Sequence, residues 1–314
     1  MERRLQSPEE IAAQAGSRIP FLVLPERCEV FRERASRLRA LAESHAMGDY
    51  LRFIARVADA QQRVLDAMPP VALPLPQFVA TCNEHGMPPL NAQTHQRDAF
   101  WRDGLRRLLR DLADSTEGLQ RDAAVRLEQR RDDYYEAQAS KLLAGITFGL
   151  DIATAPLIGA GLQVYFTHLC TTLGETSFVP AETATLCPCC GSRPSASIVR
   201  IGGDRSGYRF LHCSLCNAQW HMVRVKCANC ESTRGIGYLN LESESNATAK
   251  PAVMAEVCDE CGSYLKLCLM ERDPGVDPVA DDLATLALDL LVTDTGKSPC
   301  GVNFMLVHGD PGDA

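Results

Sequence analysis

The pattern of apolar positions predicts helices through most of the first 180 residues. After Val30, one helical face holds Phe31, Ala35, Leu38, Leu41 and His45, and the basic positions off that face are Arg32, Arg34, Arg37 and Arg39. Helical spacing resumes at 50–58, after an expected break at Gly48-Asp49, and again at 97–113 and 117–142. The sequence therefore predicts a helical bundle whose apolar stripes form its core.

A capping signal and two connectors interrupt this helical part. Ser7-Pro8-Glu9-Glu10 has the form of a capping box with proline at the first helical position. The segment 20–25, PFLVLP, is predicted to be extended because a proline at each end restricts it. Residues 69–77, PPVALPLPQ, are predicted to be a proline-rich linker.

One segment has the length of a membrane-spanning helix but not its composition. No Asp, Glu, Lys or Arg occurs between Ile152 and Gly174. Pro156, Gly159 and Gly161, with several polar side chains, make it too broken and too polar for a lipid environment. We expect a helix buried in the first domain, and no membrane anchor.

The sequence pattern changes at Cys187, where short runs rich in β-branched and aromatic residues replace the helical spacing of apolar residues. Strands are predicted at 198–201, 208–211, 221–225, 236–239, 253–257 and 264–267. An acid-capped amphipathic helix is predicted at 277–296. The fold class is therefore α+β, with a helical domain at 1–182, two β modules at 183–226 and 227–273, and a closing helix and tail at 274–314.

Eight of the 14 cysteines form four C-x-x-C pairs, arranged as an internal repeat. In the first unit, Cys187 and Cys190 precede two predicted strands, Cys213 and Cys216, and a third strand. The second unit repeats this order with Cys227, Cys230, Cys258 and Cys261. Each C-x-x-C pair forms a tight turn, called a knuckle, whose two sulfurs point to one place. A hairpin that brings two knuckles face to face gives tetrahedral S₄ coordination, so each unit is predicted to bind one metal ion.

The spacing does not identify the metal, because S₄ sites suit zinc and rubredoxin-type iron alike. A thioredoxin-like redox pair is the alternative for a single C-x-x-C, but four in tandem on hairpins do not begin helices. The residue after the second cysteine of a knuckle often needs a positive φ. Gly191 and Gly262 meet this requirement and Asn217 tolerates it, whereas Glu231 departs from it.

The remaining cysteines lack paired spacing and are expected to be small buried side chains. They are Cys28, Cys82, Cys170, Cys268 and Cys300, and the C-x-x-C register leaves Cys189 as an extra thiol between Cys187 and Cys190.

Charge and chain start limit the classes of function. The chain of 314 residues has a formal net charge of −8, which argues against a large nucleic-acid footprint. The start, MERRLQSPEE, lacks the apolar core of a secretory signal, so a cytoplasmic location with reduced thiols is expected. No Ser/His/Asp set, G-x-G-x-x-G or P-loop indicates catalysis, and a non-enzyme is predicted. The oligomeric state stays open, and a homodimer is compatible with the sequence.

Several stretches together resemble the FdhE family of formate dehydrogenase accessory proteins. They are RIPFLVLPE, FRERASRLRALAE, DYLRFIARVADAQ, the four C-x-x-C pairs with AQW after the second and YLK after the fourth, and DDLATLALDLLV. The resemblance implies a cytoplasmic, chaperone-like assembly factor that contacts the catalytic subunit of respiratory formate dehydrogenase. It also implies rubredoxin-type iron, with zinc as the alternative. The ligands it implies are Cys187, Cys190, Cys213 and Cys216 for one metal, and Cys227, Cys230, Cys258 and Cys261 for the other.

Two other functions are compatible with the same residues. A zinc-ribbon nucleic-acid binder would use a local basic patch comprising Arg193, Arg200, Arg205, Arg209 and Arg224. An electron carrier or redox sensor would use iron at one or both sites.

The C-terminal helix raises one further hypothesis. Its leucines Leu283, Leu286, Leu290 and Leu291 are expected to pack in the core. The acidic pair Asp281-Asp282 fits the start of a helix and would also suit a basic segment of a partner.

Overall fold

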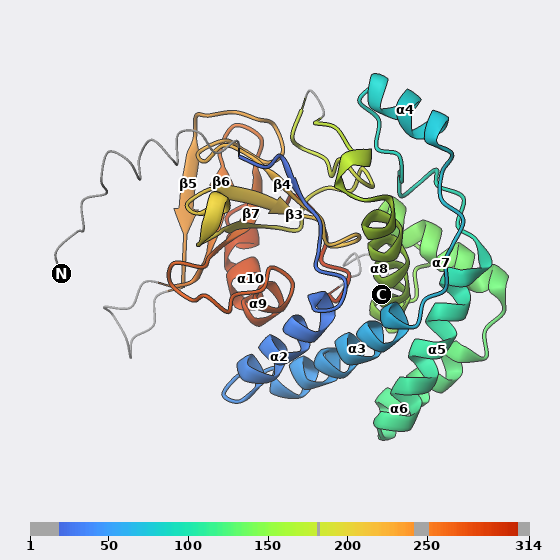
Figure 1. Cartoon of the computed structure of the whole chain (residues 1–314). Coiled ribbons are helices and arrows are strands. Elements are labelled where there is room, and N and C mark those ends of the chain that lie inside the picture. The colour runs from blue at the N-terminus through green and yellow to red at the C-terminus, as the bar shows by residue number, and fades with distance from the viewer. Residues whose placement is uncertain (1–18, 181–182, 242–250, 307–314) are drawn as a thin grey trace.

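The structure is a computed structural model that describes residues 19–180, 183–241 and 251–306. The capping box at residues 7–10 lies outside this range. Two parts follow each other along the chain: a helical part, then a sheet with two short helices against it (Figure 1). The α+β fold class predicted from the sequence is confirmed.

The helices of the first part form a layered bundle beside the sheet (Figure 1). They are α2 (Val30–Ala42), α3 (Gly48–Asp66), α4 (Pro76–Glu84), α5 (Ala99–Ser115), α6 (Gly118–Glu128), α7 (Asp132–Ala144) and α8 (Ala155–Leu173). Helix α4 was not predicted, because the proline-rich segment before it reads as linker up to the residue that begins the helix. Pro76 occupies its first turn, where a missing N–H costs nothing.

The segment predicted as one helix at 117–142 is two helices. Arg131 has an extended backbone, with ψ of 162°, and separates α6 from α7. Asp132 and Asp133 then lie in the first turn of α7, where their carboxylates face the positive end of the helix dipole. Hydrophobic spacing alone continued through this break because both helices bury one face.

Helix α8 is the buried helix predicted between residues 152 and 174. Its glycines permit close packing: a Cβ on Gly161 would lie 3.0 Å from Leu105 Cβ, and one on Gly159 would lie 2.8 Å from Phe304 Cβ. Polar side chains on this helix bond to neighbours inside the core, as Gln163 does with Gln61. Within the described residues, none of the helices combines the length and the apolar character that a bilayer crossing requires.

Within the described ranges, eight strands join in one sheet in the order β1-β4-β3-β2-β7-β6-β5, with β8 beside β7. They are β1 (Leu22–Val23), β2 (Ala196–Val199), β3 (Arg209–His212), β4 (Gln219–His221), β5 (Ile236–Leu239), β6 (Val253–Cys258), β7 (Ser263–Leu269) and β8 (Ser298–Pro299). Strands β2–β4 and β5–β7 are the two repeated units, each with antiparallel neighbours. The units meet through the parallel pair β2–β7, so both modules share one sheet.

The predicted strands occur, but two are displaced. Strand β2 begins and ends two residues before the predicted run, and β4 ends at His221. Val223 and Val225 are exposed and lie beyond the strand, and Val225 belongs to a turn with a φ of 59°. The extended segment 20–25 contributes β1, which pairs with β4 and ties the helical part to the sheet.

The single helix predicted at 277–296 is also divided. It comprises α9 (Ala280–Ala284) and α10 (Leu286–Asp294), which meet at Thr285, where φ is −115° and ψ is 31°. Leu283 is buried, as expected. Leu290 and Leu291 are 61% and 56% exposed, so the expectation that these two leucines pack in the core is wrong. After this break Leu290 and Leu291 face outward, and Leu288 and Val292 are the buried residues of α10.

Charged side chains that sequence spacing assigned to the surface are buried or half-buried at the junction of the two parts. Arg34 is 2% exposed and pairs with Asp277, and Arg37 pairs with Asp281. Asp282 pairs with Lys266. The acidic pair Asp281-Asp282 is therefore neutralised within the chain, and the hypothesis that it attracts a basic partner segment loses its basis.

We predict that Lys266 is required for stability. Its Nζ lies 3.0 Å from Asp282 Oδ1 and 2.5 Å from Asp289 Oδ2, and the lysine is 1% exposed. Lys266→Met leaves two carboxylates without a cation and should lower the free energy of unfolding by about 3 kcal/mol. Urea denaturation of the purified protein measures this.

Lys297→Met is the matched control, because Lys297 pairs with Asp259, whose side chain is 74% exposed. Its loss should cost at most about 1 kcal/mol. Equal effects of the two substitutions would contradict the assignment.

Candidate metal centres

Each C-x-x-C pair forms the same backbone turn. The N–H of the residue after the second cysteine donates to the carbonyl of the first cysteine at 2.8–3.1 Å, at Gly191, Asn217, Glu231 and Gly262. In three of the turns the first cysteine also donates its N–H to the carbonyl five residues on, as Cys187 does to Ser192 at 2.9 Å. In the folded chain these bonds fix the direction of both sulfurs of each turn.

The turns require the left-handed backbone that the sequence predicted. The φ angles are 73° at Gly191, 59° at Asn217, 60° at Glu231 and 68° at Gly262. Glu231 therefore adopts the conformation despite its side chain, at a cost of about 1–2 kcal/mol. Its carboxylate accepts from Lys226 Nζ at 2.9 Å and from the Ala184 N–H at 3.3 Å, which offsets that strain.

The structure brings the eight paired cysteines into two groups of four. Cluster 1 comprises Cys187, Cys190, Cys213 and Cys216, and cluster 2 comprises Cys227, Cys230, Cys258 and Cys261. Within each cluster all four sulfurs lie within 4.8 Å of one another. Each cluster could hold one metal ion, and its role as a ligand set stays a prediction.

The sulfur separations fit tetrahedral coordination. They are 3.5 Å for Cys187–Cys216 and 3.4 Å for Cys190–Cys213 in cluster 1. In cluster 2 they are 3.7 Å for Cys227–Cys261 and 3.8 Å for Cys230–Cys258. Metal–sulfur bonds of about 2.3 Å in a regular tetrahedron place sulfurs about 3.8 Å apart. Cluster 2 matches this spacing, and cluster 1 needs only a slight expansion.

Thiol chemistry at both clusters also favours a cation. Burial raises the pKa of the Cys258 thiol to about 12 and holds the pKa values of Cys187 and Cys216 above their usual range. Sulfurs in contact cannot all ionise without a positive charge among them. A divalent ion supplies that charge and converts the thiols to thiolates.

Cluster 1 lies at the junction of the sheet with the helical part. All four of its cysteines are buried, and so is the intervening Cys189. The carbonyls of Cys189 and Cys190 accept from the N–H groups of Leu90 and Ala92 at 3.0 and 2.8 Å. A metal at cluster 1 would therefore stabilise the contact between the two parts as well as its own hairpin.

Helix α8 and helix α2 close the other side of cluster 1. Gln163 Nε2 donates to the Ser214 carbonyl at 2.6 Å. Asn217 donates to Thr167 at 2.9 Å and accepts from Arg34 Nη2 at 2.8 Å. The second knuckle is thus bonded to the helical part through its turn residues, not through its sulfurs.

Cluster 2 lies at the surface. Cys230 and Cys261 reach solvent, whereas Cys227 and Cys258 are buried. Its sulfurs accept from the N–H of Asn229 and contact Ser263 Oγ, which lies 2.9 Å from Cys261 Sγ. Asn229 and Ser263 were not identified from the sequence, since neither residue type marks a metal site without the fold.

The unpaired cysteines follow the sequence prediction with one exception. Cys28 is exposed, so the expectation that it is buried is wrong. Cys170 packs against cluster 1, where its Sγ lies 3.5 Å from the Cys216 carbonyl. The others with this expectation, Cys82, Cys268 and Cys300, are buried, and so is the extra thiol Cys189.

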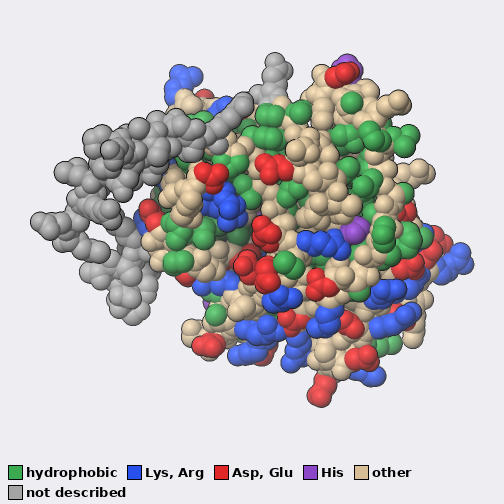
Figure 2. Space-filling view, in the orientation of Figure 1, with side chains coloured by type: hydrophobic (Ala, Val, Ile, Leu, Met, Phe, Trp, Pro, Cys, Tyr) green, Lys and Arg blue, Asp and Glu red, His purple; other side chains and the backbone are tan. Residues whose placement is uncertain are grey.

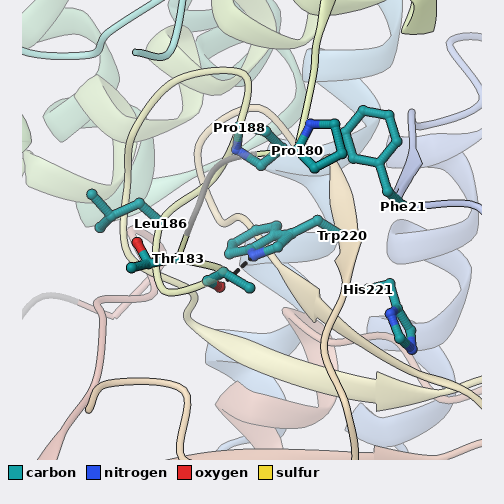
Figure 3. Close-up of a pocket in the computed structure, with 8 residues that line it drawn as sticks. Phe21, Pro180, Thr183, Leu186, Pro188, Trp220 and His221 are labelled. Atoms are coloured by element: carbon teal, nitrogen blue, oxygen red, sulfur yellow. Dashed lines mark hydrogen bonds between the residues drawn. The ribbon is translucent and has the colours of Figure 1, made fainter. Parts of the chain in front are cut away.

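A small apolar hollow adjoins the first knuckle (Figure 3). Phe21, Pro188 and Trp220 line it, and its volume is about 50 Å³. The Trp220 indole N–H donates to the Ala184 carbonyl at 2.7 Å, which fixes the ring against this loop (Figure 3). The space is too small for an organic substrate, so we interpret Trp220 as a packing residue that supports the knuckle.

Comparison with known proteins identifies relatives of the whole chain. Family models described as the FdhE N-terminal, central and C-terminal domains match residues 19–183, 186–224 and 225–306. A "Protein FdhE homolog" of Pseudomonas aeruginosa is 39% identical over 310 residues, covering 98% of this chain and 99% of that protein. One of Edwardsiella ictaluri is 40% identical over 315 residues, covering 99% and 100%.

A solved structure agrees with the fold. The crystal structure of the FdhE protein from Pseudomonas aeruginosa has a TM-score of 0.80 and 37% sequence identity to this chain. The structural match covers 93% of this chain and 100% of the Pseudomonas aeruginosa chain.

We predict that the two clusters release metal at different rates. A chelator reaches cluster 2 through Cys230 and Cys261, whereas cluster 1 must first open the core. Release monitored with a chromogenic chelator should have a fast and a slow phase of equal amplitude. Lowering the pH should speed both phases, because protons compete with the metal for thiolate sulfur.

Cys230→Ser should remove the fast phase and leave the slow one. Cys28→Ser is the control, because Cys28 is also exposed but belongs to neither cluster, and it should leave both phases. A single phase in the unmodified protein, or a fast phase that survives in Cys230→Ser, would refute the assignment.

Proposed function

The chain belongs to the FdhE family, and from this premise we propose that it is a non-catalytic accessory protein for the assembly of formate dehydrogenase. In this proposal it acts in the cytoplasm and binds the catalytic subunit of that enzyme. The observation that carries the proposal is family membership over nearly the whole chain, together with two Cys₄ clusters that could hold metal ions.

The coordination chemistry supports a role other than metal catalysis. Catalytic zinc sites keep an open coordination position for water or substrate, whereas structural sites are closed by four protein ligands. Each cluster here offers four sulfurs at tetrahedral spacing, so a bound ion would have no position left for a reactant. A metal at either cluster would then organise a surface that a partner recognises.

Iron is the metal we propose, as the resemblance to rubredoxin-type family members implies. The surface position of cluster 2 favours a second, related role. Cys230 and Cys261 reach solvent, so an iron ion at this cluster would lie close enough to the surface for electron exchange with a docked protein. The redox state of cluster 2 would then control when the partner is held or released.

The arrangement of basic residues gives less support to a nucleic-acid binder. Of the five arginines in the hypothetical patch, Arg209 is 1% exposed and pairs with Glu256 at 2.7 Å. Figure 2 shows basic and acidic side chains interleaved over helices α2, α3, α5 and α6 on the face that it draws. Ion pairs such as Arg63–Asp111 and Arg110–Glu128 account for part of this mixture.

The proposal predicts recovery of a specific partner. A tagged form of the chain, purified without oxygen from cells that express formate dehydrogenase, should retain the catalytic subunit of that enzyme. The bound protein is identified by mass spectrometry. Failure to recover the catalytic subunit with the unmodified chain would remove the proposal.

A pair of cysteine variants tests whether cluster 2 contributes to binding of the catalytic subunit. Cys230→Ser should reduce recovery of the catalytic subunit several-fold, because the knuckle loses one ligand and its surface loosens. Cys28→Ser should retain full recovery, since Cys28 is exposed and belongs to neither cluster. Equal recovery with both variants would mean that cluster 2 does not shape the docking surface.

A further inference from the structure

A large cleft separates one face of the sheet from helix α2. Its volume is about 660 Å³, within the range of about 300–1,000 Å³ found for small-molecule sites. The sheet provides the floor, helix α2 one wall, and the loop at residues 270–278 another. The cleft therefore lies where the helical part meets the first cysteine unit.

The strand register explains which side chains point into this space. Val23 lies opposite Gln219, and Gln219 lies opposite His212, so the three side chains share one face of β1, β4 and β3. Ile198 belongs to the same face because it follows Ala196, the partner of His212, by two residues. Arg200 continues this alternation just beyond the end of β2.

Two side chains in the cleft wall are buried with nitrogen atoms that lack a partner. His212 is 2% exposed, and neither of its ring nitrogens has a hydrogen-bond partner. Arg34 is 2% exposed, and its Nη1 has none, although its other nitrogens bond to Asp277 and Asn217. Burying such groups unpaired costs about 1–3 kcal/mol each, so the cleft is built to receive a polar group.

The inner part of the cleft also has an excess of positive charge. Arg200 bonds only to the neutral Gln219, at 2.9 and 2.7 Å, and no carboxylate in the described ranges lies within ion-pair distance of it. Burial and then the neighbouring Arg205 lower the pKa of Arg200, and they outweigh the opposing effect of Glu33.

The acidic residues around the cleft do not neutralise Arg200. Asp277 is committed to Arg34 and to the N–H groups of Val279 and Ala280. Glu26 and Glu33 are exposed at the rim, where solvent screens their charge.

We propose that this cleft binds a small organic anion through a carboxylate or phosphate group. Arg200, Arg205 and the free Nη1 of Arg34 are the donors for the oxyanion. Val23, Ile198, Met270 and Val276 provide an apolar surface for the body of the ligand. The proposal does not depend on the assembly role proposed above, since it concerns this cleft alone.

The cleft is joined to cluster 1 through the chain itself. His212 immediately precedes Cys213, and Asn217, whose side chain bonds to Arg34, immediately follows Cys216. An anion that holds Arg34 and the cleft wall in place would therefore also steady the second knuckle of cluster 1. Binding of the anion should slow metal release from cluster 1 and leave cluster 2 unchanged.

The test uses probes with one body and different head groups. Benzoate and phenyl phosphate present a carboxylate and a phosphate on the same ring, and benzamide is the uncharged match. Isothermal titration into the metal-loaded full chain, at constant ionic strength, should give saturable binding of at least one anion and none of benzamide. Which anion binds distinguishes a carboxylate ligand from a phosphate ligand.

Arginine variants locate the site. Arg200→Gln should weaken binding about tenfold, because one charge-assisted contact is lost. Arg205→Gln, at a more exposed position, should weaken it less, and it keeps the test valid if Arg200→Gln proves unstable. Arg224→Gln, an exposed arginine of the same module outside the cleft, carries the same charge change and should bind normally.

Three results would overturn the proposal. One is the absence of saturable binding for both anions, and another is equally tight binding of benzamide. The third is equal weakening by Arg200→Gln and Arg224→Gln, which would indicate general charge attraction.

Discussion

The contact among four cysteine sulfurs, twice repeated, is the constraint on which the sheet depends. Sulfurs 3.4–3.8 Å apart in pairs, with burial opposing their ionisation, form an arrangement that a cation stabilises. The strands between the knuckles are short, with four residues in β2, β3 and β5. Hairpins of this size bury too little apolar surface to hold themselves together. Metal binding and folding of the sheet are therefore expected to be one process.

The two copies of the four-cysteine unit lie in different environments. Cluster 1 is enclosed by α8, α2 and the segment around Leu90, and its turn residues bond to both helices. In cluster 2 the second cysteine of each knuckle, Cys230 or Cys261, is exposed at the surface. The same four-sulfur chemistry can thus serve two purposes, a fixed joint between the helical part and the sheet, and an accessible site at which a partner or an electron can approach.

The grouping of the cysteines could be predicted from the sequence because it depends on short local turns. The C-x-x-C register and the positive φ after each second cysteine belong to short local turns. The sequence alone therefore indicated that Asn217 tolerates this backbone and that Glu231 departs from the usual glycine, and both residues have a positive φ. The predictions that failed concern features that depend on contacts between residues far apart in the sequence. Arg34 is charged yet buried because Asp277 and Asn217, more than 180 residues away, receive it. The turn at Thr285 and the cleft above β3 depend on how α9, α10 and α2 pack against the sheet, which helical spacing does not encode.

X-ray absorption spectroscopy at the iron and zinc edges, on protein purified without oxygen, tests the central claim most directly. The account predicts about two metal ions per chain, each surrounded by four sulfur atoms at about 2.3 Å. A first shell of nitrogen or oxygen ligands at about 2.0–2.1 Å, or a folded chain that carries no metal, would contradict it.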